Sequence, residues 1–347
     1  MAYTTIPKSS DYFNTKLYTG NASTLNITGL DFQPDLCWLK IRSAIDNHAL
    51  FDSVRGVQKR IASNLTAVES NRSTSLTSFN SDGFTLGNNS ETNANSGTYA
   101  AWNWLANGAG VSNTDGSISS TVSVNTISGF SIVSFTGTGA NATVGHGLGV
   151  APKMVILKSR ANAYNWGVYH ASIGATKYLR LNSTNAEATS SAYFQDTAPT
   201  STFITLGSDL NINDSGNMIA YCFAEKQGYS KFGSYTGNGN DDGAFVYTGF
   251  KPAFVMVKIT AGQADNWIMQ DNKINSFNGA SSQRLRPNSP GAEFSSSNEI
   301  DLLSNGFKTH GADGEINGSG FSYIYIAFAE QPFVTSTGNG SIPTTAR

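Results

Sequence analysis

The sequence has few charged side chains, since Asp, Glu, Lys and Arg make up only 13% of its 347 residues. Ordinary soluble domains carry about 25%. The 22 basic and 24 acidic residues leave a net charge of −2, too little to hold a phosphate backbone or an anionic membrane surface. No apolar run approaches the ~20 residues that cross a bilayer. We therefore expect no nucleic-acid partner and no membrane insertion.

Cysteine is also scarce, because Cys37 and Cys222 are the only two. Two residues cannot form a disulfide framework. The first residues lack the basic-then-apolar order of a secretory signal. We therefore expect a chain made in the cytosol without a signal peptide, with both thiols reduced and buried.

The patterns of common catalytic and metal sites are missing as well. The four histidines have neither the i, i+4 spacing nor the Cys-x-x-Cys company of a zinc site; they are His48, His146, His170 and His310. The adjacent pair Asp241 and Asp242 precedes Gly243 and indicates a turn, or at most a weak Ca²⁺ ligand cluster. We expect no enzymatic function, no cofactor and no metal site.

Hydrophobic and turn-forming residues are plentiful. Apolar residues make up 39% of the chain, with 20 Phe, 14 Tyr and 5 Trp, which is enough for packed interiors. Stretches such as 130–135 and 323–328 are rich in β-branched and aromatic residues, and glycine and asparagine separate them. This pattern predicts an all-β protein of antiparallel sandwich or jelly-roll type.

One sequence pattern recurs along the chain at intervals of about 100 to 117 residues. An aromatic residue precedes Thr-Gly, a proline follows 14 or 15 residues later, and a lysine six residues further on closes an apolar run. The glycines are Gly20, Gly137 and Gly237, the prolines Pro34, Pro152 and Pro252, and the lysines Lys40, Lys158 and Lys258. A period this long predicts tandem domains rather than the stacked units of a solenoid.

The repeated phrase divides the chain into three tandem β-sandwich or jelly-roll-like domains related by an internal repeat. We expect each domain to bury its own core, like beads on a string. The composition of a Gly-, Ser- and Asn-rich segment predicts a linker. The two ends of the chain are predicted to be arms that dock on neighbouring molecules. The predicted parts are an arm at 1–16, domains at 17–106, 129–227 and 228–333, a linker at 107–128 and an arm at 334–347.

Asparagine followed by a ring is the one feature with binding chemistry. It occurs as Asn47-His48, Asn165-Trp166 and Asn266-Trp267, seven or eight residues after each lysine. An amide beside an exposed indole suits a sugar, which makes Asn165, Trp166, Asn266 and Trp267 the candidate ligand-binding residues. The competing interpretation, which we favour, is that each tryptophan starts a core strand after an asparagine turn.

Several longer phrases, taken together, resemble an uncharacterised tandem-repeat family encoded by tailed bacteriophages of aquatic bacteria. They are 51–56 (FDSVRG), 78–87 (SFNSDGFTLG), 228–239 (GYSKFGSYTGNG) and 334–338 (VTSTG). The resemblance covers nearly the whole chain and carries no established active site. It implies a virion structural protein exposed on the surface of the particle.

Two functions fit this resemblance. In the first, the chain is a head-decoration protein or part of a short fibre or appendage. Its partners are then other virion proteins of the capsid or tail, and further copies of itself on the particle. In the second, it is a receptor-binding tail-fibre module that recognises a host surface glycan through the loops of Trp166 and Trp267. The sequence contains no coiled-coil or β-helical shaft, which favours the first.

Overall fold

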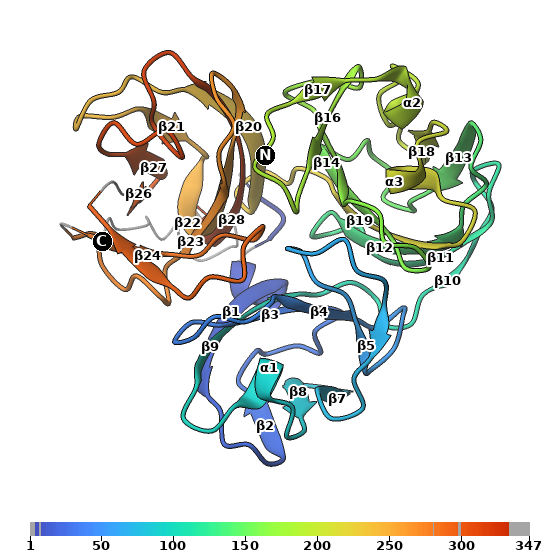
Figure 1. Cartoon of the computed structure of the whole chain (residues 1–347), viewed down its shortest axis with the longest axis horizontal. Helices are drawn as coiled ribbons and strands as arrows, with labels where there is room; N and C mark the ends of the chain where they lie inside the picture. Colours follow the sequence, from blue (N-terminus) through green and yellow to red (C-terminus); the bar gives the residue numbers. More distant parts are fainter. Residues whose placement is uncertain (1–3, 7, 280, 298–299, 333–347) are drawn as a thin grey trace.

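The computed structural model describes residues 4–6, 8–279, 281–297 and 300–332 and contains several antiparallel sheets, with 44% strand and 5% helix. Figure 1 shows three lobes arranged around a common centre. We refer to residues 8–106 as lobe 1, 107–227 as lobe 2 and 228–332 as lobe 3. The predicted C-terminal arm at 334–347 lies outside the described residues.

Lobe 1 contains a four-stranded sheet in the order β1-β9-β3-β4, a three-stranded sheet in the order β2-β8-β7, and a short β5-β6 pair. Its elements are η1 (Ser9–Asp11), β1 (Phe13–Thr19), β2 (Leu25–Thr28), β3 (Leu36–Ile41), β4 (Ala49–Asp52), β5 (Lys59–Arg60), β6 (Ser70–Asn71), β7 (Leu76–Asn80), β8 (Gly83–Leu86), α1 (Ser90–Asn93) and β9 (Thr98–Trp104).

Lobe 2 contains an eight-stranded sheet in the order β10-β11-β12-β19-β14-β15-β16-β17 and a β13-β18 pair. Its elements are β10 (Val111–Asn113), β11 (Ser120–Asn125), β12 (Phe130–Thr136), β13 (Ala142–Gly145), β14 (Met154–Ser159), β15 (Gly167–His170), β16 (Lys177–Arg180), β17 (Ala188–Thr189), α2 (Ser191–Phe194), β18 (Phe203–Leu206), α3 (Leu210–Asn213) and β19 (Asn217–Phe223).

Lobe 3 contains a four-stranded sheet in the order β20-β28-β22-β23, a three-stranded sheet in the order β21-β27-β26, and a β24-β25 pair. Its elements are β20 (Ser230–Thr236), β21 (Phe245–Tyr247), β22 (Phe250–Ala261), β23 (Trp267–Asp271), β24 (Ser282–Arg284), β25 (Phe294–Ser296), β26 (Ile300–Leu303), β27 (Gly306–Thr309) and β28 (Ser322–Pro332).

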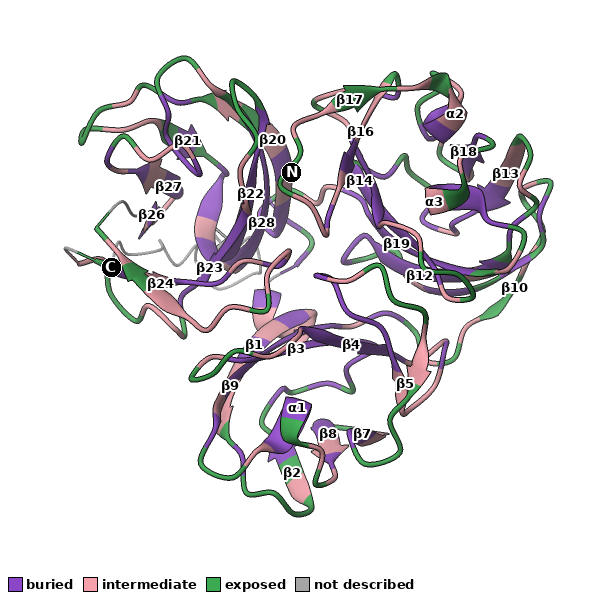
Figure 2. Ribbon diagram, in the orientation of Figure 1, coloured by how far each residue is buried: buried purple, intermediate pink, exposed green. Residues whose placement is uncertain are grey.

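The strands that contain the three repeated lysines are β3, β14 and β22, and most of their residues are buried on both faces (Figure 2). Because side chains alternate across a strand, Cys37 and Leu39 pack inside lobe 1 while Leu36 and Trp38 point the other way. Each lobe thus has an interior cluster of its own and a second apolar face that needs a partner.

Those second faces meet in one central core that all three lobes share. Its buried members come from every large sheet and from segments beside the sheets, and they include Trp38, Trp102, Ile156, Tyr221, Met256 and Ile326. Each lobe buries a cluster of its own as expected, but the lobes are not independent, because this shared core joins them. Separating the lobes would expose this apolar surface to water, which costs about 25 cal/mol of free energy for each Å².

Two predicted boundaries also differ from the structure. The segment 107–128 is not a simple linker, because β11 within it pairs with β12 and buries Val122. Its alternating Thr121-Val122-Ser123-Val124 is a strand pattern that the neighbouring glycines obscured. Of the predicted arm at 1–16, the described residues 4–6 and 8–16 are built into the fold, since Ile6 and Phe13 belong to the central core.

The repeated Thr-Gly phrase has a steric cause in the structure. A Cβ atom would lie 2.2 Å from a backbone oxygen at Gly20, 2.0 Å at Gly137 and 2.4 Å at Gly237. Any other residue would clash there, because contacts below about 3 Å are repulsive. Each glycine therefore lets a loop of its own lobe pass against the end of the first strand.

Candidate functional site

The predicted Asn-ring residues lie where the lobes meet, and each asparagine forms a reciprocal clamp. In lobe 2 the Trp166 N–H donates to Asn182 Oδ1 at 2.9 Å, and Asn182 Nδ2 donates to Asn165 Oδ1 at 3.0 Å. The other lobes repeat both bonds, with His48 N to Asn64 Oδ1 at 3.0 Å, Asn64 Nδ2 to Asn47 Oδ1 at 2.7 Å, Trp267 N to Asn288 Oδ1 at 3.0 Å and Asn288 Nδ2 to Asn266 Oδ1 at 2.8 Å.

Each ring then donates a hydrogen bond into the next lobe. Nε1 of Trp166 donates to Ala62 O in lobe 1 at 2.9 Å, and Nε1 of Trp267 donates to Arg180 O in lobe 2 at 3.0 Å. His48 Nε2 lies 3.0 Å from Arg286 O in lobe 3. The three contacts run from lobe 2 to lobe 1, from lobe 3 to lobe 2 and from lobe 1 to lobe 3, so they close a ring.

The sugar-binding interpretation of these residues required exposed indoles, and both indoles are buried. Trp166 is 0% exposed and Trp267 is 1% exposed. A buried ring has no free face on which a sugar could stack. We therefore assign Asn165, Trp166, Asn266 and Trp267 to holding the lobes together, which agrees with the core interpretation.

Two histidines sit at the joints in neutral form. Trp38 Nε1 donates to His48 Nδ1 at 2.9 Å, so the proton of His48 is on Nε2, facing Arg286 O. In the same way the Ser172 N–H faces His170 Nδ1, and His170 Nε2 faces Tyr325 O across the joint between lobes 2 and 3. Burial lowers the pKa of His48 to about 3 and that of His170 to about 4.

A backbone clasp with a glutamate lies beside each ring contact. The Glu69 N–H donates to Arg160 O at 3.0 Å, the Glu293 N–H to Arg42 O at 2.8 Å, and the Glu187 N–H to Thr260 O at 3.0 Å. Each glutamate is five residues after its clamp asparagine, and each acceptor is two residues after its lysine. A main-chain hydrogen bond between residues at the same sequence spacings thus occurs at all three joints.

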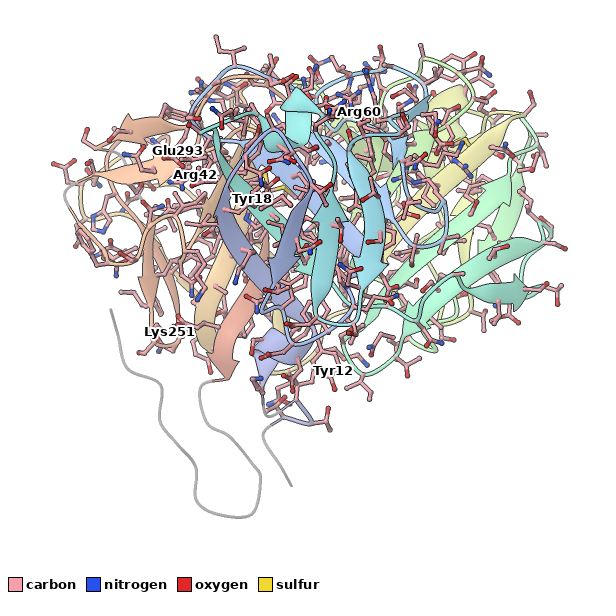
Figure 3. All side chains as sticks on the ribbon, turned by 90° about the horizontal axis from the view of Figure 1, so that it is seen from below. Tyr12, Tyr18, Arg42, Arg60, Lys251 and Glu293 are labelled. Carbon is pink, nitrogen blue, oxygen red and sulfur yellow. The ribbon has the colours of Figure 1, made fainter. Side chains whose placement is uncertain are left out.

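Two of these glutamates also bind their arginine through both carboxylate oxygens. Arg160 donates to Glu69 from Nε at 2.9 Å and from Nη2 at 3.0 Å. Arg42 donates to Glu293 from the same two nitrogens, at 2.5 and 3.0 Å. Arg42 and Glu293 lie side by side at one end of the molecule, away from Tyr12 and Lys251 (Figure 3). Bidentate pairing of this kind is a strong, charge-assisted contact.

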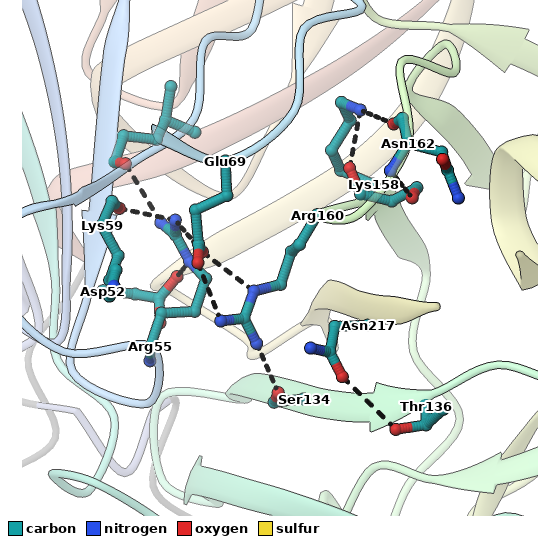
Figure 4. Close-up of polar contacts among 12 residues, drawn as sticks. Asp52, Arg55, Lys59, Glu69, Ser134, Thr136, Lys158, Arg160, Asn162 and Asn217 are labelled. Atoms are coloured by element: carbon teal, nitrogen blue, oxygen red, sulfur yellow. Dashed lines mark hydrogen bonds and ion pairs between the residues drawn. The ribbon is translucent and has the colours of Figure 1, made fainter. Parts of the chain in front are cut away.

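The joint between lobes 1 and 2 carries a larger network (Figure 4). Arg55 is fully buried and contacts Asp52 at 2.5 Å and Glu69 at 3.2 Å, while Tyr221 of lobe 2 donates to Asp52 at 2.7 Å. Burial alone would raise the pKa of Glu69, but its hydrogen bonds and charge contacts with Arg160 and Arg55 hold that pKa below the usual value. Neighbouring charges therefore compensate the burial of each ion in the network.

The three repeated lysines are buried close to these joints. The ammonium groups of Lys40 and Lys158 donate to the last carbonyl of their strand, Ile41 O at 2.6 Å and Ser159 O at 2.7 Å, and to a carbonyl of the loop that follows, Ala44 O at 3.4 Å and Asn162 O at 3.3 Å. Lys258 reaches across a joint to Thr184 O at 2.8 Å. Burial lowers each lysine pKa to about 8. Each lysine fixes the course of its loop.

A polar cleft of about 380 Å³ opens between lobes 2 and 3. Hydroxyl groups and one ion pair dominate its lining, which includes Ser172, Lys177, Glu187, Ser234, Thr260 and Tyr323. The central core encloses a second space of about 20 Å³ with an apolar lining, which has room for little more than one water molecule. Of the two, the cleft is the larger candidate for binding a ligand.

The acidic pair Asp241 and Asp242, considered above as a turn or a weak Ca²⁺ cluster, contacts side chains of the same lobe. Asp242 pairs with Lys308, and His310 Nδ1 lies 2.9 Å from Asp241 O. Within the described ranges, no group of three or more His, Cys, Asp or Glu side chains is placed to hold a metal ion. Cys37 and Cys222 are buried free thiols, and burial raises the pKa of both. No helix in the described part of the chain is long and apolar enough to cross a bilayer.

The sequence analysis missed a buried asparagine in each lobe. Asn93, Asn213 and Asn317 are fully buried, and each accepts a backbone N–H from the residue after the repeated glycine, at 2.8 to 3.0 Å. Each also donates to several loop carbonyls. Their signal was an asparagine three or four residues before the closing glycines Gly97, Gly216 and Gly320.

A family model described as "Domain of unknown function (DUF7483)" matches residues 8–332. The chain belongs to this family. No curated protein matches the chain.

Proposed function

We propose that this DUF7483 protein is a structural protein of a bacteriophage virion, exposed on the particle surface as a head decoration or part of a short fibre. Its three lobes enclose one core and are latched by repeated ring, backbone and ion-pair contacts. This arrangement supports the proposal most directly, because a closed block presents outer surfaces in fixed relation to its neighbours.

We also propose that the lobes are three β-sandwich copies of one unit. In each large sheet a closing strand, β9, β19 or β28, lies between β1, β12 or β20 and the strand that contains the repeated lysine. The asparagine clamps and buried asparagines also recur. An experimental structure in which the shared strands and both asparagines of the three lobes failed to superpose would contradict this proposal.

The alternative, a tail-fibre module that recognises a host glycan, loses its proposed residues because Trp166 and Trp267 are buried. The two functions predict different partners. A structural protein binds capsid or tail proteins and copies of itself, whereas the tail-fibre module binds a host glycan. A glycan array with the intact protein tests the alternative, and specific, saturable binding would revive it at other residues.

Cryo-electron microscopy of the intact phage, with and without the gene, tests the structural proposal. We expect density of three-lobed shape at repeated positions on the head or on a short appendage, and loss of that density in the deletion phage. An unchanged virion, in which mass spectrometry also detects no copy of the chain, would overturn the proposal.

A further inference from the structure

The three joints share a backbone clasp but differ in one side chain. Arg42 and Arg160 stand two residues after their lysines, and the equivalent residue in lobe 3 is Thr260. Threonine cannot reach a carboxylate as arginine does. At the joint between lobes 2 and 3, the Glu187 N–H therefore still donates to Thr260 O at 3.0 Å. The residue at position 260, however, supplies no guanidinium group to the Glu187 carboxylate.

The cleft occupies the place that the arginine fills elsewhere. At the joint between lobes 1 and 2, Arg160 Nη1 donates to Ser134 Oγ at 3.2 Å. Ser234 has the equivalent register in lobe 3, since Ser134 lies opposite Ile219 and Ser234 opposite Ile324. Both Ser234 and Thr260 line the cleft together with Glu187. The glutamate found at both filled joints and the serine acceptor of the joint between lobes 1 and 2 are thus retained around an open volume.

Glu187 is paired instead with a more exposed cation from its own lobe. Lys177 contacts its Oε1, and the side chain of Lys177 is 40% exposed against 16% for Glu187. An exposed lysine pair contributes little to stability because water competes for both ions. An incoming cation with better geometry can displace this ammonium at small cost.

We propose that the cleft between lobes 2 and 3 binds a guanidinium group, presented as an arginine side chain of a protein partner. The guanidinium pairs with Glu187 through two parallel hydrogen bonds, as Arg42 and Arg160 do at the other joints, and Ser234 Oγ accepts a further N–H. A planar fork suits this set of acceptors better than an ammonium does. The ligand chemistry can be tested on the isolated protein, apart from its place on a virion.

The test is a titration of the ¹⁵N-labelled full chain with N-acetyl-arginine methylamide, followed by amide chemical shifts. We expect saturable shifts at Glu187, Thr260 and Ala261. N-acetyl-lysine methylamide should bind at least fivefold more weakly. Equal binding of both cations, or no saturable shift with the arginine compound, would overturn the proposal.

Two substitutions and one control make the result specific. Thr260→Arg supplies the missing guanidinium from within and should abolish binding, and Glu187→Gln should weaken it at least tenfold. Thr121→Arg adds the same charge at an exposed position of β11 and should leave binding unchanged. A thermal melt checks that each variant is folded. Undiminished binding to folded Glu187→Gln protein would contradict the assignment even if Thr260→Arg failed to fold.

Discussion

The joint between lobes 1 and 2 and the joint between lobes 2 and 3 share a backbone hydrogen bond from a glutamate but differ in the side chains around that glutamate. In the first, Arg160 and the buried Arg55 share Glu69. In the second, Glu187 faces a cleft and pairs with the partly exposed Lys177. The comparison separates what assembles the lobes, namely the central core and the backbone clasps, from what fills the space between them.

The largest effect should follow from breaking the filled joint. Asp52→Ala leaves the Arg55 guanidinium buried without its nearest carboxylate and removes the acceptor of Tyr221. We expect a loss of about 3 to 5 kcal/mol in the free energy of unfolding, because an uncompensated buried charge is costly. Urea unfolding at pH 7 measures this loss. A loss below about 1 kcal/mol would show that the network adds little to the joint.

Acid should weaken the two joints of lobe 3 through His48 and His170. Their folded pKa values of about 3 and 4 lie below the unfolded value of 6.5. The stabilisation is complete above pH 6.5 and is lost as the pH falls toward the folded values. By pH 5 the loss should be about 2 kcal/mol for each ring.

Long-range ¹⁵N–¹H spectra measure these two rings directly. At pH 5 both imidazoles should still be neutral, with the proton on Nε2. A ring that titrates near pH 6.5 in the folded protein would contradict its burial at the joint.

Arg160→Thr should convert the filled joint into an open one. Glu69 would lose its bidentate partner but keep Arg55 and its backbone clasp, so we expect a loss of about 1.5 kcal/mol by urea unfolding. The variant should also gain a second binding site for N-acetyl-arginine methylamide, seen as new shifts at Glu69. Binding that stays at a single site would show that the frame alone does not select guanidinium.

The smallest effect should come from Glu187→Gln at the open joint. Its ion pair with Lys177 is partly exposed, and we expect a change below about 1 kcal/mol in the same assay. The matched change Glu69→Gln should cost more, because Arg55 and Arg160 would both lose a charged partner. Equal losses for the two variants would remove the distinction between the joints.

Local patterns predicted much of this molecule. Strand alternation predicted the β class, and the spacing of Lys40, Lys158 and Lys258 identified three strands that correspond to one another. The Asn-ring phrase marked places that turned out to be joints. Sequence patterns reveal local geometry well because strand and turn chemistry is local.

The shared core could not be located in the same way. A run such as Leu36-Cys37-Trp38-Leu39 shows that both faces of a strand are apolar, but not what covers the second face. Burial of Trp166 and Trp267 depends on a neighbouring lobe far away in the sequence. The pairing of Glu69 with Arg160 likewise joins residues 91 positions apart, and neither residue differs locally from a surface ion.

Because one chain encodes all three joints separately, a change at one of them leaves the other two intact. An assembly of three identical subunits cannot do this, since any substitution would appear at every interface. The threonine at position 260 therefore makes the joint between lobes 2 and 3 different from the other two joints. A neighbouring protein can distinguish this side of the molecule by its open cleft.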